Sequence, residues 1–152
     1  MEMRSRIDAA LKDAMKAKDA DRLSTLRLIN AAIKDRDIAS RGEGAEGGVG
    51  EAEILAILGK MVKQRQESAR AYEEAGRLEL AQKEQAEIRV IEDFLPRQLD
   101  AEEVEAAVAE VIAETGADSI RDMGKVMAAL KARYTGRMDF GAVGPLVKDK
   151  LA

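Results

Sequence analysis

Apolar residues recur at intervals of three and four along most of this chain, which is the spacing of amphipathic helices. The first forty residues contain two such stripes, and five more lie near residues 51–75, 77–95, 101–115, 119–134 and 139–151. Asp19 or Asp21 can cap the second helix, Gly76 supplies a stop for the third, and Pro96 prevents the fourth from continuing. No segment shows the alternation of a strand. We therefore predict an all-α fold.

Two positions divide this helical pattern. The short link at Gly76 predicts a long antiparallel hairpin, built from the third and fourth helices. After Pro96, the acidic start at residues 100–103 resembles a helix cap and opens a second module. We predict an N-terminal helical bundle over residues 1–96 and a C-terminal three-helix module over residues 97–152.

The segment from Arg41 to Gly50 is rich in glycine and has no apolar pattern. It lacks the closing Gly-Lys-Ser/Thr of a phosphate-binding loop and follows no strand, and its Glu43 and Glu46 would repel phosphate. We expect a disordered linker there.

Cysteine and histidine are both absent, which removes disulfides, thiol nucleophiles, Cys/His zinc sites and imidazole bases. The many acidic pairs, such as Glu73-Glu74 and Glu92-Asp93, fall on outward faces, where solvated helix surfaces explain them better than catalysis does. We expect no catalytic residue, no metal and no cofactor. No early targeting segment and no long apolar run is present, so we expect no membrane partner and a cytoplasmic location.

Polar residues interrupt two apolar stripes of the predicted hairpin. Arg65 falls on the stripe of the third helix, and Glu84 on that of the fourth. Folding about Gly76 would bring Arg65 to Glu84 or Glu87, with Ser68 nearby, because a charge on an inward face needs a partner. A structural role in fixing the hairpin register and a ligand-binding role are both open.

Charge is unevenly distributed in the C-terminal module. Residues 100–122 carry eight acids against Arg121, whereas residues 123–152 carry six bases against Asp139 and Asp149. This locally basic end is the best candidate for a surface that meets phosphates, although a solvated face is an alternative. Its six basic residues are Lys125, Lys131, Arg133, Arg137, Lys148 and Lys150.

The stretch from Gln64 to Val104 resembles the central signature of the GatB/YqeY family. The resemblance rests on Gln64-Arg65, Ser68, Gly76-Arg77, Leu80, Lys83-Glu84, Glu87 and the run from Phe94 to Leu99. The tail from Met123 onward is similar to the end of the same family and, more distantly, to the tail domain of the B subunit of the aspartyl/glutamyl-tRNA amidotransferase.

This resemblance implies an N-terminal helical bundle, a smaller three-helix module, and a tail associated with tRNA recognition. We expect an accessory protein without catalysis of its own that binds tRNA or a tRNA-modifying or aminoacylating enzyme through the six basic residues. One alternative is a contribution to carbon-nitrogen ligase activity with glutamine as the amide donor, but the chain has no Ser-Ser pair, cysteine or phosphate loop for it. Another is a protein-interaction adaptor.

Overall fold

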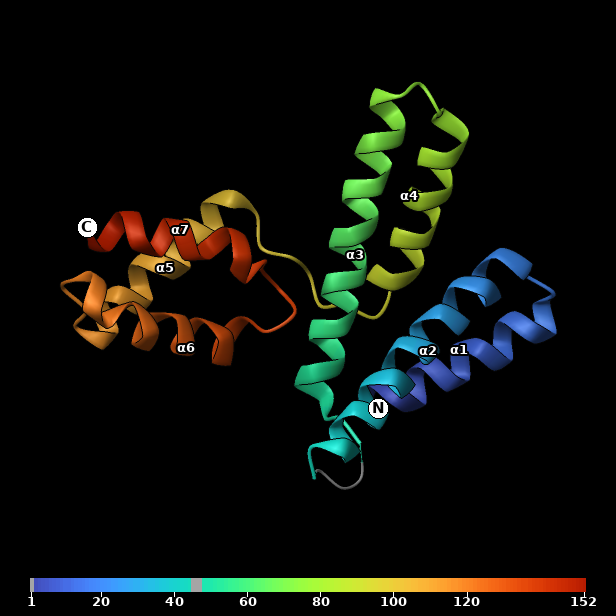
Figure 1. Ribbon diagram of the computed structural model, residues 1–152, viewed down its shortest axis with the longest axis horizontal. Coiled ribbons are helices and arrows are strands. Elements are labelled where there is room, and N and C mark those ends of the chain that lie inside the picture. The colour runs from blue at the N-terminus through green and yellow to red at the C-terminus, as the bar shows by residue number, and fades with distance from the viewer. Residues whose placement is uncertain (1, 45–47) are drawn as a thin grey trace. The chain divides into compact units, whose positions relative to one another are not determined.

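The computed structural model describes residues 2–44 and 48–152. Within these ranges the chain forms seven α-helices and one short 3-10 helix, and no strand, which confirms the all-α prediction (Figure 1). Packing divides the chain into two compact units, which we call the N-terminal unit (Met1–Leu95) and the C-terminal unit (Pro96–Ala152).

The N-terminal unit contains α1 (Met3–Ala17), α2 (Ala20–Gly42), α3 (Glu51–Glu74) and α4 (Leu78–Glu92). A tight turn separates α1 from α2, where Lys18 takes the left-handed conformation and the Asp19 side chain accepts from the backbone N–H of Arg22 at 3.2 Å. This cap satisfies one of the N–H groups that the start of a helix leaves open.

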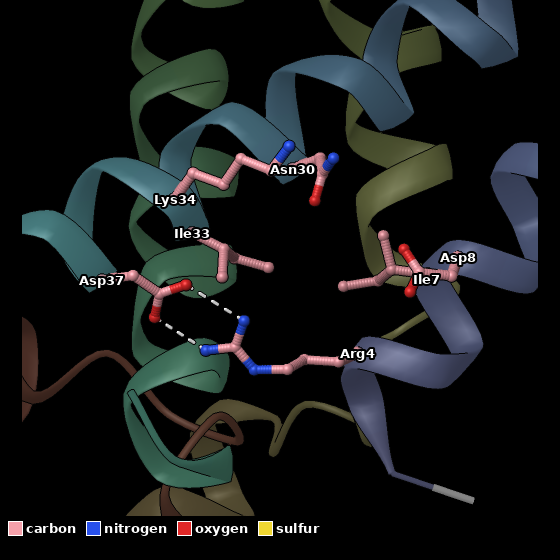
Figure 2. Close-up of a pocket in the computed structure, with 7 residues that line it drawn as sticks. All are labelled: Arg4, Ile7, Asp8, Asn30, Ile33, Lys34 and Asp37. Carbon is pink, nitrogen blue, oxygen red and sulfur yellow. Dashed lines mark hydrogen bonds and ion pairs between the residues drawn. The ribbon is translucent and has the colours of Figure 1, made fainter. Parts of the chain in front are cut away.

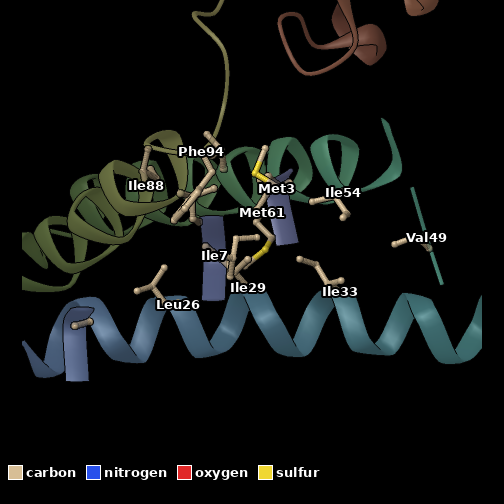
Figure 3. Packing of buried hydrophobic residues seen from close by; sticks show 14 residues of the cluster. Met3, Ile7, Leu26, Ile29, Ile33, Val49, Ile54, Met61, Ile88 and Phe94 are labelled. Carbon is tan, nitrogen blue, oxygen red and sulfur yellow. The ribbon is translucent and has the colours of Figure 1, made fainter. Parts of the chain in front are cut away.

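The core of the N-terminal unit lies where all four helices meet. Ile7 of α1 and Ile29 of α2 face Met61 of α3, and Phe94 closes the cluster just beyond α4 (Figure 3). Burial of each large aliphatic side chain stabilises the fold by about 1.5–3 kcal/mol. The buried members of this core are Met3, Ile7, Ala14, Leu26, Ile29, Ile33, Val49, Ile54, Leu58, Met61, Val62, Ile88, Ile91 and Phe94.

The hairpin of α3 and α4 turns at Gly76, whose φ of +74° lies in the region that favours glycine. The Arg77 N–H closes the end of α3 by donating to the Tyr72 carbonyl at 2.8 Å. Leu80 marks where the core of the hairpin ends. It belongs to the apolar stripe of the fourth helix by spacing, yet it is 39% exposed, because it lies beyond the part of the hairpin that contributes to the core.

The glycine-rich segment is shorter than the sequence suggests and is held at its end. Helix α2 extends to Gly42, so the first two residues of the expected linker are helical. Residues 45–47 of that linker lie outside the described residues. Val49 is 6% exposed and belongs to the core, so the expectation of a wholly disordered linker is wrong at this end.

The C-terminal unit contains α5 (Ala101–Thr115), a 3-10 turn (Ile120–Asp122), α6 (Met123–Tyr134) and α7 (Phe140–Leu151). A full capping box starts α5, because Asp100 accepts from the Glu103 N–H at 2.8 Å and Glu103 accepts from the Asp100 N–H at 3.2 Å. The buried core of this unit is Ala107, Val108, Val111, Val126, Leu130, Met138, Val143, Val147 and Leu151.

Candidate nucleic-acid interface

Four lysines of the C-terminal unit lie on exposed surface. Lys125 and Lys131 are on α6, and Lys148 and Lys150 are in the last turn of α7. In the parts of the chain that the structure describes, none of the four forms an ion pair with a carboxylate. Their ammonium groups are therefore available to an external anion, and the two on α7 also complement the negative end of that helix.

Lys125 and Lys131 lie on either side of a row of small residues on α6. Gly124, Ala128 and Ala132 follow one another at intervals of four, and all three are exposed. A side chain added at Gly124 would meet nothing within 4 Å. Because no large side chain stands between the two lysines, a rigid anion such as a phosphate backbone can approach this helix closely.

The two arginines of the predicted set are engaged within the unit. Arg133 pairs with Glu114 of α5, and this contact raises the pKa of the arginine and lowers that of the carboxyl. Arg137 donates through Nε to the Arg97 carbonyl at 3.1 Å, and its guanidinium lies 6.0 Å from the centre of the Tyr134 ring. Both arginines thus connect parts of this unit, in contrast to the four lysines.

Arg121 is a further exposed cation, and it is not among the six basic residues predicted to bind phosphates. It lies on the 3-10 turn, four residues before Lys125, and forms no ion pair within the described ranges. Arg121 lies in residues 100–122, whose net charge is negative, so the charge of that segment did not indicate a binding residue. The neighbouring Asp122 has a lowered pKa, chiefly because it accepts from the Asp118 N–H at 3.1 Å, with a further contribution from Lys125.

Aromatic side chains offer little to a nucleic-acid base in this unit. Tyr134 and Phe140 are half-buried and pack against its core. The chain has no tryptophan. Stacking on bases is the usual basis of single-strand binding, so a nucleic acid would meet this surface through phosphates.

The polar pair of the hairpin lies in the N-terminal unit. Arg65 donates through Nε to Glu87 at 2.9 Å and through a terminal nitrogen to the Met61 carbonyl at 3.2 Å. The side chains of Arg65 and Glu87 are only 15% and 18% exposed. Ser68 is exposed and Glu84 is half-buried, and neither has a hydrogen-bond or ion-pair partner among the described residues.

A cleft of about 240 Å³ opens between α1 and α2 (Figure 2). Ile7 and Ile33 point toward each other in it, with Asp8, Asn30 and Lys34 around the opening. The residues that line the cleft include no serine, threonine, cysteine or histidine, and the carboxylates of Asp8 and Asp37 are separated from each other (Figure 2). Two apolar side chains and the groups of Arg4 and Asp37 thus line the space between α1 and α2.

One end of this cleft is a clamp formed by Arg4 and Asp37. Asp37 accepts from two Arg4 nitrogens, at 2.7 and 3.1 Å, and from the Val49 N–H at 2.8 Å. Arg4 also donates to the Val49 carbonyl at 3.0 Å. The Arg4 hydrogen bond, followed by that from Val49, lowers the pKa of Asp37 to about 2. The clamp thus joins α1, α2 and Val49, which lies two residues before the start of α3.

Gly48 is required beside this clamp. Its φ is +84°, and a Cβ atom there would lie 2.6 Å from an Asp37 carboxylate oxygen. Sequence reasoning missed the clamp because its members are widely separated along the chain; the one local signal is the glycine directly before a buried valine.

The described ranges contain neither a membrane-spanning helix nor a cluster of metal-binding carboxylates. None of the described helices combines the length and hydropathy that a bilayer-spanning helix requires. The described residues also contain no group of three or more acidic side chains placed to hold a metal ion.

Comparison with known proteins supplies a family match. The sequence model of the Yqey-like protein family matches residues 4–151. Two relatives are called "Altered inheritance of mitochondria protein 41, mitochondrial". The one from Eremothecium gossypii is 36% identical over 56% of this chain and 44% of its own length. The one from Clavispora lusitaniae is 36% identical over 60% of this chain and 50% of its own length.

These relatives correct one prediction. The chain spans about half the length of the curated relatives it matches. The prediction of a cytoplasmic location is wrong by this comparison, since the relatives are named mitochondrial proteins. That prediction rests on the absence of a targeting segment, and such an absence does not establish a location.

Proposed function

We propose, from the premise that this chain belongs to the family of Yqey-like proteins, that its C-terminal unit binds the phosphate backbone of tRNA. The protein would then be an accessory module that brings tRNA to an enzyme, without chemistry of its own. The observation that carries the proposal is the set of exposed, unpaired lysines on α6 and α7, namely Lys125, Lys131, Lys148 and Lys150.

The different roles of lysine and arginine in this unit support the proposal. Arg133 and Arg137 form contacts within the unit, so removing them would disturb its packing as well as any ligand contact. The four lysines contact no carboxylate of the described chain, so an ammonium group can exchange water and counterions for phosphate oxygens. We therefore assign the predicted binding role primarily to the lysines and assign the arginines to the support of the surface.

A phosphate-only surface favours a folded RNA over an unstructured strand. With Tyr134 and Phe140 packed against the core, no exposed aromatic face offers stacking to a splayed base. The small residues between Lys125 and Lys131 allow a double-helical stem to lie close to α6. Recognition would then depend on the shape of the tRNA rather than on its sequence.

The test is a salt series of binding to purified tRNA, with two quadruple variants of equal charge. One changes Lys125, Lys131, Lys148 and Lys150 to Ala. The matched control changes Lys12, Lys16, Lys34 and Lys60, which are exposed lysines of the N-terminal unit, to Ala. Each variant removes four positive charges, so a general effect of net charge would appear equally in both.

We expect the C-terminal variant to lower affinity by about tenfold or more and to reduce the slope of log K against log salt by roughly 3, because each phosphate contact releases about 0.7–0.9 counterion. The control should change both quantities much less. Failure of the parent protein to bind tRNA even at low salt, or an equal loss in both variants, would reject the proposal. Duplex DNA at equal phosphate concentration distinguishes tRNA recognition from general polyanion binding.

A further inference from the structure

The outer part of the α3–α4 hairpin has no role in the core. No residue between Val62 and Ile88 belongs to the hydrophobic cluster of the N-terminal unit. Figure 1 shows the turn of this hairpin at the end away from α1 and α2. Only small side chains, Ala69 and Ala81, are buried there. Three large side chains remain open to solvent there: Leu78 at 61% exposure, Leu80 at 39% and the half-buried Tyr72.

Six residues of this hairpin lie along one side of α3 or of α4. Arg65, Ser68 and Tyr72 recur at intervals of three and four, so they follow one side of α3. Leu80, Glu84 and Glu87 do the same on α4.

The ion pair between Arg65 and Glu87 joins these two sides across the seam. We call the six residues together the hairpin face: Arg65, Ser68, Tyr72, Leu80, Glu84 and Glu87.

One carboxylate of the hairpin face has no cation. Arg65 is engaged with Glu87, and Glu84, one turn nearer the hairpin tip, forms neither a hydrogen bond nor an ion pair within the described chain. Glu84 is half-buried, and Leu80 lies four residues before it on the same side of α4. A partly desolvated acceptor next to an exposed aliphatic side chain is suited to a group that is both cationic and apolar.

We infer that the hairpin face docks a segment of a partner protein that presents Lys or Arg beside an aliphatic residue. The aliphatic residue would cover Leu80 and Tyr72, and the cation would pair with Glu84. The charge of the surrounding surface agrees, because five carboxylates lie beyond the Arg65–Glu87 pair, at Glu67, Glu73, Glu74, Glu79 and Glu84, against three cations, at Arg70, Arg77 and Lys83. The same negative balance disfavours a nucleic acid here. This inference does not depend on tRNA binding by the C-terminal unit.

A random peptide library displayed on phage tests this partner chemistry with the full-length protein as bait. The variant L80S/E84Q serves for counter-selection. We expect the recovered peptides to be enriched in Lys or Arg next to Leu, Ile or Val. Recovery of acidic peptides, or of none that prefer the parent protein over the variant, overturns the inference.

Single variants then assign the contact, with affinity for the best peptide measured by fluorescence anisotropy. E84Q should weaken binding about fivefold, since it removes one partly desolvated ion pair. L80S should weaken it roughly tenfold through lost apolar burial. The matched control E79Q removes the same charge from an exposed site of α4 that lies off the hairpin face, and it should change affinity less than about twofold.

Equal losses for E79Q and E84Q would show a general effect of charge and overturn the inference. A large loss of tRNA affinity in E84Q and L80S, together with no peptide binding, would also overturn the inference, because the hairpin face would then bind RNA. Both positions are solvent-accessible, and circular dichroism melts of the variants verify that the fold is retained.

Discussion

The N-terminal unit has exposed ion pairs, such as Arg22–Asp93, but it also has two pairs that are largely shielded from solvent. The two ion pairs described in the C-terminal unit both lie at the surface. Arg4 pairs with Asp37 across 33 positions, and Arg65 with Glu87 across 22. In each of these pairs one or both side chains are largely shielded, with Asp37 13% exposed and Glu87 18%. In the C-terminal unit, the pairs Arg97–Glu103 and Arg133–Glu114 leave every partner at least 36% exposed.

This difference indicates what each set of charges does. Shielded pairs that join separate helices help to determine how those helices pack, and removing one partner leaves the other poorly solvated. Exposed pairs contribute little to stability, and unpaired lysines beside them contribute less still. The two shielded pairs of the N-terminal unit therefore serve its fold, and the exposed lysines of the C-terminal unit are available for a ligand.

The largest expected effect comes from crowding the Arg4–Asp37 clamp. We expect Gly48→Ala to destabilise the N-terminal unit by roughly 2–3 kcal/mol, because the added Cβ meets Asp37 and the backbone conformation becomes strained. Urea unfolding, followed by the fluorescence of Tyr72 in a Tyr134→Phe background, isolates this unit, since each unit has one tyrosine.

Gly44→Ala is the matched control for that substitution. Its φ is +92°, so it carries a similar backbone cost, but its Cβ would meet nothing within 4 Å. We expect a loss of about 1 kcal/mol from backbone strain alone. Equal losses at both glycines would mean that the contact between the added Cβ and Asp37 costs nothing beyond backbone strain, which would weaken the contrast between the units.

The next effect concerns the pair inside the hairpin. Arg65→Met should destabilise the N-terminal unit by about 2 kcal/mol, because Glu87 would remain shielded without a cation. The double variant Arg65→Met/Glu87→Leu should recover most of the loss, since it leaves no unpaired charge. Arg97→Met is the comparison in the C-terminal unit, and its effect there should be smaller. A larger loss of stability for Arg97→Met than for Arg65→Met would contradict the proposal that the shielded pair contributes more to the fold than the exposed pair.

These contacts also show what the sequence could predict. Periodicity and end signals, such as the capping box at Asp100 and Glu103 and the turn at Gly76, act over a few residues, so the helices and the all-α fold were predictable. The spacing of Arg65 on an apolar stripe indicated an inward charge. It could not choose between Glu84 and Glu87, because one turn of helix separates the two and the choice depends on register.

Contacts that depend on the packing of distant helices could not be predicted. Nothing local to Arg4 or Asp37 indicates that they meet, or that Val49 closes the linker against them. Leu80 is an example in which periodicity predicts too much burial. Its spacing places it on an apolar stripe of the fourth helix, but the core does not extend as far as Leu80. A periodic pattern identifies the face of a helix, and the length of the neighbouring helices decides how much of that face is covered.

Lowering the pH tests the comparison of the two units, because each unit has one carboxyl group with a strongly lowered pKa. The pKa of Asp37 in the N-terminal unit and that of Glu103 in the C-terminal unit are each lowered to about 2, in both cases first by an arginine hydrogen bond. In an unfolded chain these groups titrate near about 4. Their stabilisation is therefore present above about pH 4 and is lost as the pH falls toward 2.

We expect Asp37→Asn to be less stable than the parent at pH 7, with a difference that narrows between about pH 4 and pH 2. Urea midpoints followed through Tyr72 measure this, and Glu103→Gln followed through Tyr134 gives the counterpart. Asp37 is more shielded than Glu103 and also accepts from the Val49 N–H. The loss of stability at pH 7 should therefore be larger for Asp37→Asn than for Glu103→Gln. A pH-independent difference would mean that the pair with Arg4 does not carry the effect.

The smallest expected effect is at the lysines assigned to tRNA. Lys125→Ala and Lys131→Ala should each change the free energy of unfolding of the C-terminal unit by less than about 0.5 kcal/mol, because neither side chain forms an ion pair within the described residues and alanine is a good helix former. The attraction between Lys125 and Asp122 is the last of the effects on the Asp122 pKa. Urea unfolding followed through Tyr134 in a Tyr72→Phe background measures the change. A loss above about 1 kcal/mol would show that these lysines support the fold. Any fall in tRNA affinity in the same variants could then reflect unfolding, so unchanged stability is the condition under which the salt series identifies a binding surface.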